Sequence, residues 1–202
     1  MDSLRKLQSL FKRFPGIGER QAMRLAYFVA TADDMYVRDL TDTIALIRKS
    51  VRRCARCYAL SEKILEGTCS VCNDPATDKT MILIVEKDAD RDRFMKSKTY
   101  SGTYFVLGGL APAVEKDVSS HIRTNELAAL ISKESPKEVI LALSATPDGD
   151  RTERIIKDTI ISIVEAKNIQ LSMLGKGLST GTEIEYSDSE TLGNALRTRT
   201  TD

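Results

Sequence analysis

Residues 81–86 read Met-Ile-Leu-Ile-Val-Glu, an apolar run that ends on a carboxylate, and residues 139–143 read Val-Ile-Leu-Ala-Leu. Short continuous runs of this kind are typical of strands buried on both faces, because helices cover both sides of a parallel sheet. Helical patterns near 88–96 and 124–133 lie between the two runs. This alternation predicts an α/β fold with an open parallel sheet and helices on both faces.

The chain on either side of these runs extends the predicted sheet. Residues 103–107 and 169–173 have the composition of further strands, and residues 150–167 have helical spacing. A short tail follows, in which we expect an edge strand over 183–186 and a helix around 191–196. The sheet region is thus expected to end in a short tail that contains one strand and one helix.

Three carboxylates follow the predicted central strands. Glu86 comes directly after the first run, and Asp148 and Asp150 follow the second. The carboxyl ends of parallel strands form the edge where open α/β sheets bind ligands. The arrangement resembles the Toprim domain of topoisomerases and primases, in which such acids hold magnesium, an ion that prefers oxygen ligands. The alternative is that Asp148 and Asp150 only cap the following helix, and the sequence leaves both interpretations open.

All cysteines of the chain lie in two Cys-x-x-Cys pairs, separated by the eleven residues 58–68. Four thiolates at this spacing close a tetrahedral shell and leave no position for substrate or water, so the site is expected to be structural. Disulfides are the alternative, and a reducing compartment disfavours them. The sequence predicts one zinc ion held by Cys54, Cys57, Cys69 and Cys72.

Basic side chains precede and interleave the first cysteine pair. They could lower the pKa of the thiols or contact phosphate, and a solvated helix end that favours cations is the alternative. The chain up to Lys63 holds 13 Lys and Arg against 7 Asp and Glu, whereas the remainder holds 17 against 22. This local excess suggests a polyanion contact in the N-terminal third. The flanking residues are Arg48, Lys49, Arg52, Arg53 and Arg56.

A glycine turn divides the helical N-terminal region. Apolar spacing predicts helices on both sides of Phe14-Pro15-Gly16-Ile17-Gly18 and a third helix over 37–51. The turn resembles the helix-hairpin-helix element of repair proteins, because its glycines let the backbone approach a phosphate at a helix N-terminus. An ordinary turn between helices is the alternative. The residues predicted to contact DNA, without base specificity, are Lys12, Arg13, Gly16, Ile17, Gly18, Arg20 and Arg24.

The overall composition is typical of a globular protein, with 42% hydrophobic and 29% charged residues and a net charge of +1. No apolar run approaches the length that spans a bilayer, and the first residues do not form a secretory signal. We therefore expect a cytoplasmic protein without a membrane role.

Taken in order, these segments resemble the RecR family of bacterial recombination mediators over essentially the whole chain. Besides the hairpin and the cysteines, the resemblance depends on residues 104–112 (Tyr-Phe-Val-Leu-Gly-Gly-Leu-Ala-Pro), 138–142 (Glu-Val-Ile-Leu-Ala) and 181–186 (Gly-Thr-Glu-Ile-Glu-Tyr). The sequence departs from the family pattern in two places. The loop after Pro112 lacks the usual glycine-rich sequence, and Asp148-Gly149-Asp150 is closer to metal-binding Toprim domains than many members are.

The resemblance implies a protein that is not an enzyme. Members of this family act with RecO, and in some settings with RecF, to load the RecA recombinase onto single-stranded DNA coated by single-strand-binding protein. The resemblance also implies a ring-shaped homotetramer around DNA, DNA contacts at the positions of Arg20 and Arg24, and a Toprim domain that serves partner and DNA binding.

The predicted organisation has four parts: a helical DNA-binding region over 1–53, a zinc segment over 54–76, a Toprim-like domain over 77–174 and a tail over 175–202. One alternative function is a magnesium-dependent Toprim nuclease or nicking enzyme, although so short a chain leaves no room for a separate strand-transfer domain. A second is a zinc-stabilised interaction protein without affinity for DNA. Cleavage assays and salt-dependent DNA binding separate these three functions.

Overall fold

The computed structural model describes residues 2–112, 122–178 and 180–199. Residues 113–121, which include the loop that departs from the family pattern, and the last three tail residues lie outside this part of the chain. The chain divides into two compact units, Met1–Val51 and Arg52–Asp202. The predicted zinc segment and tail therefore belong to the same unit as the sheet.

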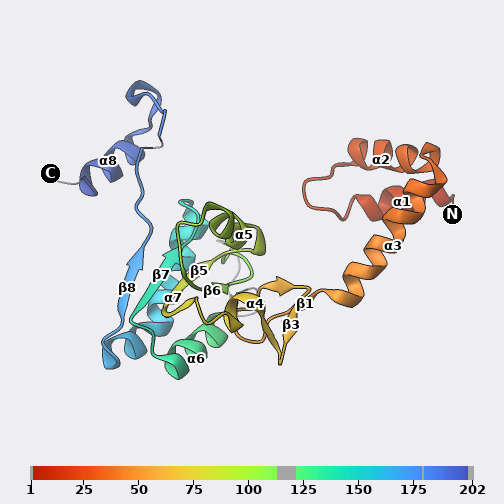
Figure 1. Cartoon of the computed structure of the whole chain (residues 1–202). Coiled ribbons are helices and arrows are strands. Elements are labelled where there is room, and N and C mark those ends of the chain that lie inside the picture. Colours follow the sequence, from red (N-terminus) through yellow and green to blue (C-terminus); the bar gives the residue numbers. More distant parts are fainter. Residues whose placement is uncertain (1, 113–121, 179, 200–202) are drawn as a thin grey trace. The chain divides into compact units, whose positions relative to one another are not determined.

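The first unit consists of three helices, α1 (Ser3–Phe11), α2 (Glu19–Thr31) and α3 (Asp34–Ser50). Aspartates begin two of them: Asp2 accepts a hydrogen bond from the Leu4 amide (3.2 Å), and Asp33 accepts one from the Met35 amide (2.8 Å). Helices α1 and α2 lie side by side (Figure 1). Two fully buried alanines of α2, Ala22 and Ala26, leave the space for this close packing.

The second unit begins with the cysteine segment. Two short antiparallel hairpins, β1 (Arg52–Arg53) with β2 (Leu60–Ser61) and β3 (Ile64–Leu65) with β4 (Thr68–Cys69), precede the one-turn helix α4 (Ser70–Asn73). This segment leads into the first strand of the main sheet.

The main sheet is parallel and has the strand order β6-β5-β7-β8 (Figure 1). Its strands are β5 (Asp78–Val85), β6 (Gly102–Val106), β7 (Glu138–Ala142) and β8 (Gln170–Met173). The connecting helices are α5 (Asp88–Ser97), α6 (Thr124–Glu134) and α7 (Pro147–Ala166). Both apolar runs of the sequence form central strands, and this confirms the predicted α/β fold with an open parallel sheet.

Alternate residues of the central strands pack into two cores. Ile82, Ile84 and Phe105 form one core with α6 and α7, through side chains such as Leu127 and Ile156. On the other face, Leu83, Val85, Tyr104 and Val106 pack with Phe94 of α5 and with the four cysteines. The zinc segment is thus part of the core of this unit.

The tail differs from the prediction. Residues 183–186, for which we expected an edge strand, form a 3-10 turn (Ile184–Tyr186), and the helix α8 spans Ser189–Arg197. The amide of Tyr186 bonds to the Glu183 carbonyl at 3.2 Å, so this donor is not available to a sheet. Both apolar side chains of the stretch are exposed, Ile184 at 67% and Tyr186 at 77%, and no buried face therefore favours a strand.

Candidate metal centre, helical hairpin and sheet edge

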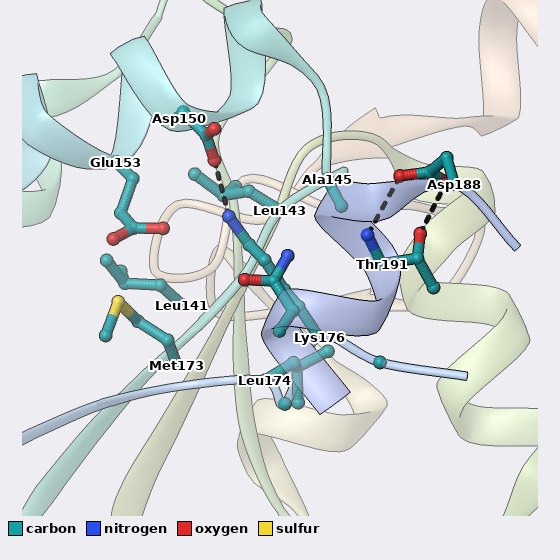
Figure 2. A pocket seen from close by; sticks show the side chains of 13 residues that line it. Leu141, Leu143, Ala145, Asp150, Glu153, Met173, Leu174, Lys176, Asp188 and Thr191 are labelled. Carbon is teal, nitrogen blue, oxygen red and sulfur yellow. Dashed lines mark hydrogen bonds and ion pairs between the residues drawn. The ribbon is translucent and has the colours of Figure 1, made fainter. Parts of the chain in front are cut away.

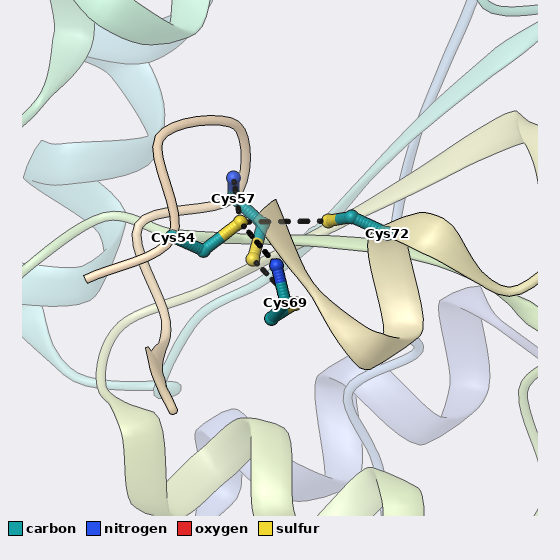
Figure 3. A group of neighbouring side chains, drawn as sticks. All are labelled: Cys54, Cys57, Cys69 and Cys72. Carbon is teal, nitrogen blue, oxygen red and sulfur yellow. Dashed lines mark hydrogen bonds between the residues drawn. The ribbon is translucent and has the colours of Figure 1, made fainter. Parts of the chain in front are cut away.

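The four cysteine side chains point toward one another (Figure 3). Their sulfur atoms all lie within 4.8 Å of one another, and all four residues are buried. Within the described part of the chain, this is the only group of three or more cysteine, histidine or acidic side chains arranged to hold a metal ion. The spacing of the cysteines in the sequence therefore predicted the cluster correctly.

Backbone geometry shapes the cluster. The Cys54 sulfur accepts hydrogen bonds from the amides of Cys57 (3.5 Å) and Cys69 (3.3 Å). Tyr58 and Gly67, one in each hairpin, take left-handed backbone conformations with φ of 59° and 84°. The two hairpins are joined by a bond from the Ala55 amide to the Gly67 carbonyl (2.8 Å). The ligand positions are therefore set by the backbone of both hairpins together.

The electrostatics of the cluster favour a bound cation. Hydrogen bonding with the Cys54 sulfur, together with burial, raises the pKa of the Cys57 and Cys72 thiols above the usual range. The hydrogen bond with Cys57 lowers the pKa of Cys54 in turn. Four thiolates can share this space only if a cation compensates their charge, and such a cation would displace the remaining protons. The donor set and burial therefore fit a structural metal ion.

Arg56 joins the cysteine cluster to the sheet. Its guanidinium forms two hydrogen bonds with the Glu134 carboxylate (2.7 and 2.5 Å) and one with the Thr103 hydroxyl (3.1 Å), and it lies 3.6 Å from the Cys72 sulfur. Burial opposes the charge of Arg56, but the bonds with Glu134 and Cys72 outweigh it and raise the pKa. With its side chain only 14% exposed, Arg56 faces the protein interior and does not offer its charge to phosphate.

The cysteine segment also covers the edge strand of the sheet. The Val106 amide of β6 donates to the Cys57 carbonyl (2.8 Å), and the Tyr58 ring packs edge-on against Phe105, with ring centroids 5.4 Å apart. An uncovered edge strand is a template for unwanted pairing, and this contact protects it. The sequence carried no signal for these contacts, because Glu134 and Phe105 are distant from the cysteines along the chain.

The glycine turn connects α1 to α2 as predicted. Gly16 has a φ of +74°, in the left-handed region that favours glycine, and the Ile17 amide bonds to the Phe14 carbonyl at 3.1 Å. Gly18 is the N-cap of α2. Because it has no side chain, no capping hydrogen bond is made to the first amides of this helix. A Cβ built on Gly16 or Gly18 would meet nothing within 4 Å. The turn therefore presents open backbone at a helix N-terminus, which is the geometry that binds phosphate.

The basic residues around the turn are exposed. Arg20 and Arg24 are four residues apart on α2, so they lie on one face of the helix. Lys12 forms a 3.6 Å ion pair with Glu19, a surface contact of small energy. The structure thus brings the predicted DNA-contacting residues to one end of the helix pair, with Arg13 exposed beside Lys12.

Large apolar side chains are exposed on the helices of the first unit. The apolar stripe predicted over 37–51 is exposed along its second half in the part of the chain that the structure describes, where Ile44 is 53% and Ile47 is 47% exposed. Contiguous exposed apolar surface usually marks a protein–protein contact. The exposed residues are Leu10, Phe14, Tyr27, Phe28, Met35, Tyr36, Ile44, Leu46 and Ile47.

The three predicted magnesium ligands do not gather into one group. Glu86 is 5% exposed and accepts a hydrogen bond from the Ser144 amide, so it joins the ends of β5 and β7. Asp150 forms an ion pair with Lys176, and Asp148 lies in the first turn of α7. The helix is capped by Thr146, whose hydroxyl accepts from the Gly149 amide (3.1 Å). Neither aspartate is the cap, so the capping interpretation of Asp148 and Asp150 is wrong.

A cavity of about 470 Å³ lies beside Asp150, between the ends of β7 and β8 and the tail, and neither Glu86 nor Asp148 lines it (Figure 2). Leu141 and Met173 contribute apolar side chains, and Lys176 points across the cavity to Asp150. Asp188 of the tail lines the cavity too and caps α8 through the Thr191 amide (2.8 Å). The pairing of Asp150 with a tail lysine could not be inferred from sequence, because the two residues are distant along the chain.

Gly149 fixes the start of α7 at this edge. It is buried, and a Cβ at this position would overlap the Ser144 carbonyl group, whose carbon would lie at 3.0 Å. We expect Gly149→Ala to destabilise the second unit by about 3 kcal/mol, because backbone cannot move aside as a side chain can. Chemical denaturation measures this change in the free energy of unfolding.

The matched control is Gly193→Ala in α8, where a Cβ meets nothing within 4 Å. This substitution should leave stability unchanged or raise it by up to about 1 kcal/mol, because alanine favours helix over glycine. Equal effects of the two substitutions would contradict the packing seen at Gly149.

No helix in the described ranges is long and apolar enough to cross a membrane.

Comparison with known proteins gives consistent matches. Residues 80–174 match the family model of the Toprim domain, and residues 177–200 match the model described as RecR, C-terminal. Recombination protein RecR of Rhodospirillum rubrum is 35% identical over 96% of this chain and 95% of its own. The protein of the same name from Brachyspira hyodysenteriae is 31% identical over 98% of this chain and 96% of its own. That from Bacteroides thetaiotaomicron is 32% identical over 98% and 93%.

Proposed function

Because the chain belongs to the RecR family of recombination proteins, which act in recombination and repair, we propose that it is a DNA-binding recombination mediator. In this role it acts with RecO, and in some settings RecF, to load RecA onto single-stranded DNA coated by single-strand-binding protein. The observation that carries the proposal is the open glycine turn at the start of α2, with exposed Arg20 and Arg24 on the same helix. Together they suit a DNA backbone phosphate.

The metal in this proposal is one structural zinc ion per chain. The thiolate shell formed by Cys54, Cys57, Cys69 and Cys72 suits zinc and leaves no open coordination position. When bound, zinc compensates the charge of the thiolates and holds the two hairpins together. Arg56 bonds to Glu134 of α6, and the Cys57 carbonyl accepts from the Val106 amide of β6, so the ordered hairpins are also fixed to these two elements.

Self-association into a homotetrameric ring is also part of the proposal. Its support is the exposed apolar surface of the first unit, which includes Phe28 (53%) and Met35 (77%). A monomer would leave these side chains in water, whereas a second copy of the chain could cover them. Mass in solution, with and without DNA and RecO, measures this assembly directly.

The proposal assigns no catalytic role to the Toprim-like acids. Glu86 bonds to the Ser144 amide and Asp150 pairs with Lys176, so two of the three acids already have partners within the fold. The alternative function is a magnesium-dependent nuclease or nicking enzyme that uses Glu86, Asp148 and Asp150. Ligands dispersed in this way would have to move before they could share an ion.

A cleavage assay separates the two functions. Supercoiled plasmid and labelled single-stranded DNA, incubated with the protein and Mg²⁺, should be bound without yielding products. Cleavage that is lost in Asp148→Asn but kept in Asp158→Asn, an exposed aspartate on the same helix, would establish the nuclease and overturn the mediator proposal. The matched pair excludes a contaminating nuclease, which neither substitution would remove.

A further inference from the structure

Two arginines from distant parts of the second unit contact Tyr58. Arg53 donates a hydrogen bond from its guanidinium to the Tyr58 carbonyl (2.7 Å). The guanidinium carbon of Arg123 lies 5.4 Å from the centre of the Tyr58 ring, within the range of a cation–π contact. Tyr58 therefore brings together a residue of the cysteine segment and a residue at the start of α6.

Contacts within the second unit fix the side chains of both Arg53 and Arg123. Arg123 donates to the Val106 carbonyl (3.0 Å), and a Cβ on Gly108 would lie 2.5 Å from its guanidinium nitrogen. Gly108 also has a φ of +107°. Glycine is therefore favoured at this position both by the backbone conformation and by the lack of space for a Cβ. Arg53 lies 3.6 Å from the Asp88 carboxylate, which also accepts the Leu60 amide. The pair is thus fixed at the carboxyl end of β6 before any ligand arrives.

The positive charges of Arg53 and Arg123 are only partly compensated by nearby acids, so an anion can bind to them. Burial first, and then the positive charge of Arg53, lower the pKa of Arg123, while Glu126 and Asp88 act in the opposite direction. Asp88 is also engaged with the Leu60 amide and lies 3.6 Å from Arg53. Among the described residues, each guanidinium uses only one nitrogen in these contacts, and the Arg53 side chain is 44% exposed. In the part of the chain that the structure describes, the other guanidinium N–H groups of both arginines have no partner, so they can bind a ligand.

From this geometry we propose that Arg53 and Arg123 form a phosphate-binding site for the DNA backbone, in addition to the glycine turn of the first unit. The inference rests on the proposed DNA-binding function and deepens it. Arginine presents its donors as a planar fork that matches a phosphate, and two forks fixed by one tyrosine need little ordering on binding. Contacts of this kind position DNA without reading its sequence. Both units of the chain then contact DNA.

The test is the salt dependence of binding to a single-stranded oligonucleotide, measured with the full chain loaded with zinc. Arg53→Gln and Arg123→Gln should each reduce the slope of log K against log salt by about 0.7, the value for one phosphate contact on single strands. Arg53→Lys keeps the charge but loses the fork, and should weaken binding less than Arg53→Gln. The control is Arg154→Gln, an exposed arginine on α7, which should leave the slope unchanged.

Arg123 also holds β6 and Tyr58, so zinc content and thermal unfolding of each variant are measured in parallel. Arg53→Gln is the decisive variant because its side chain is exposed. If Arg20→Gln with Arg24→Gln weakens binding while Arg53→Gln and Arg123→Gln do not, the two arginines only brace the cysteine segment and the inference is wrong. If the unchanged protein does not bind DNA, the proposed function itself fails and this site fails with it.

Discussion

Cys54→Ser should abolish stoichiometric zinc and lower the free energy of unfolding by about 4 kcal/mol or more, because metal binding and folding are coupled in structural zinc sites. The backbone of both hairpins holds Cys54, since its sulfur accepts the amides of Cys57 and Cys69 and lies 3.8 Å from that of Cys72. The cysteines share a core with Leu83 and Tyr104, so the loss should extend beyond the hairpins to the sheet.

Elemental analysis and chemical denaturation test this prediction together. The control is Ser70→Ala, which alters an exposed side chain next to Cys69 and should retain one zinc per chain with unchanged stability. A protein whose unfolding transition is unaffected by removal of the metal with a chelator would show that the cluster does not depend on zinc.

The double substitution Arg20→Gln with Arg24→Gln should weaken DNA binding across all sequences. Each lost phosphate contact reduces the slope of log K against log salt by about 0.7 on single strands and about 0.9 on duplexes, so two contacts lower affinity roughly 25- to 60-fold at 0.1 M salt. Because both side chains are exposed on α2, the stability of the first unit should not change.

The control for this pair is Arg38→Gln, an exposed arginine on α3 of the same unit. It removes one positive charge without altering the glycine turn, and it should leave both affinity and slope nearly unchanged. If the double substitution has no more effect than this control, the turn is an ordinary connection between helices and DNA binds elsewhere.

Features set by local pattern were predictable from the sequence. The runs at 81–85 and 139–143 became the central strands, because continuous apolar sequence is stable only where both faces are covered. The cysteine spacing predicted the cluster, since two close pairs need only one intervening loop to meet. The glycine turn was predictable because residues 14–18 interrupt two helical patterns, and the positive φ of Gly16 agrees with this prediction.

Features set by distant partners were not predictable. Arg56 was a candidate phosphate ligand, yet Glu134 of α6 engages it inside the protein. The convergence of Glu86, Asp148 and Asp150 was expected because the three follow neighbouring strands, but they do not gather: Glu86 accepts the Ser144 amide, and Asp150 pairs with Lys176. The tail alternates polar and apolar residues over 183–186, and this pattern cannot distinguish a strand from a turn when neither face is buried.

The measurement that tests the central claim most directly is RecA-dependent ATP hydrolysis on single-stranded DNA coated by single-strand-binding protein, with RecO present. Adding this protein should shorten the lag before hydrolysis begins. With the double variant Arg20→Gln and Arg24→Gln, the lag should remain nearly as long as without the protein. Arg38→Gln should shorten the lag as much as the unchanged protein does. An unchanged lag with protein that binds DNA and carries zinc would contradict the proposed role as a recombination mediator.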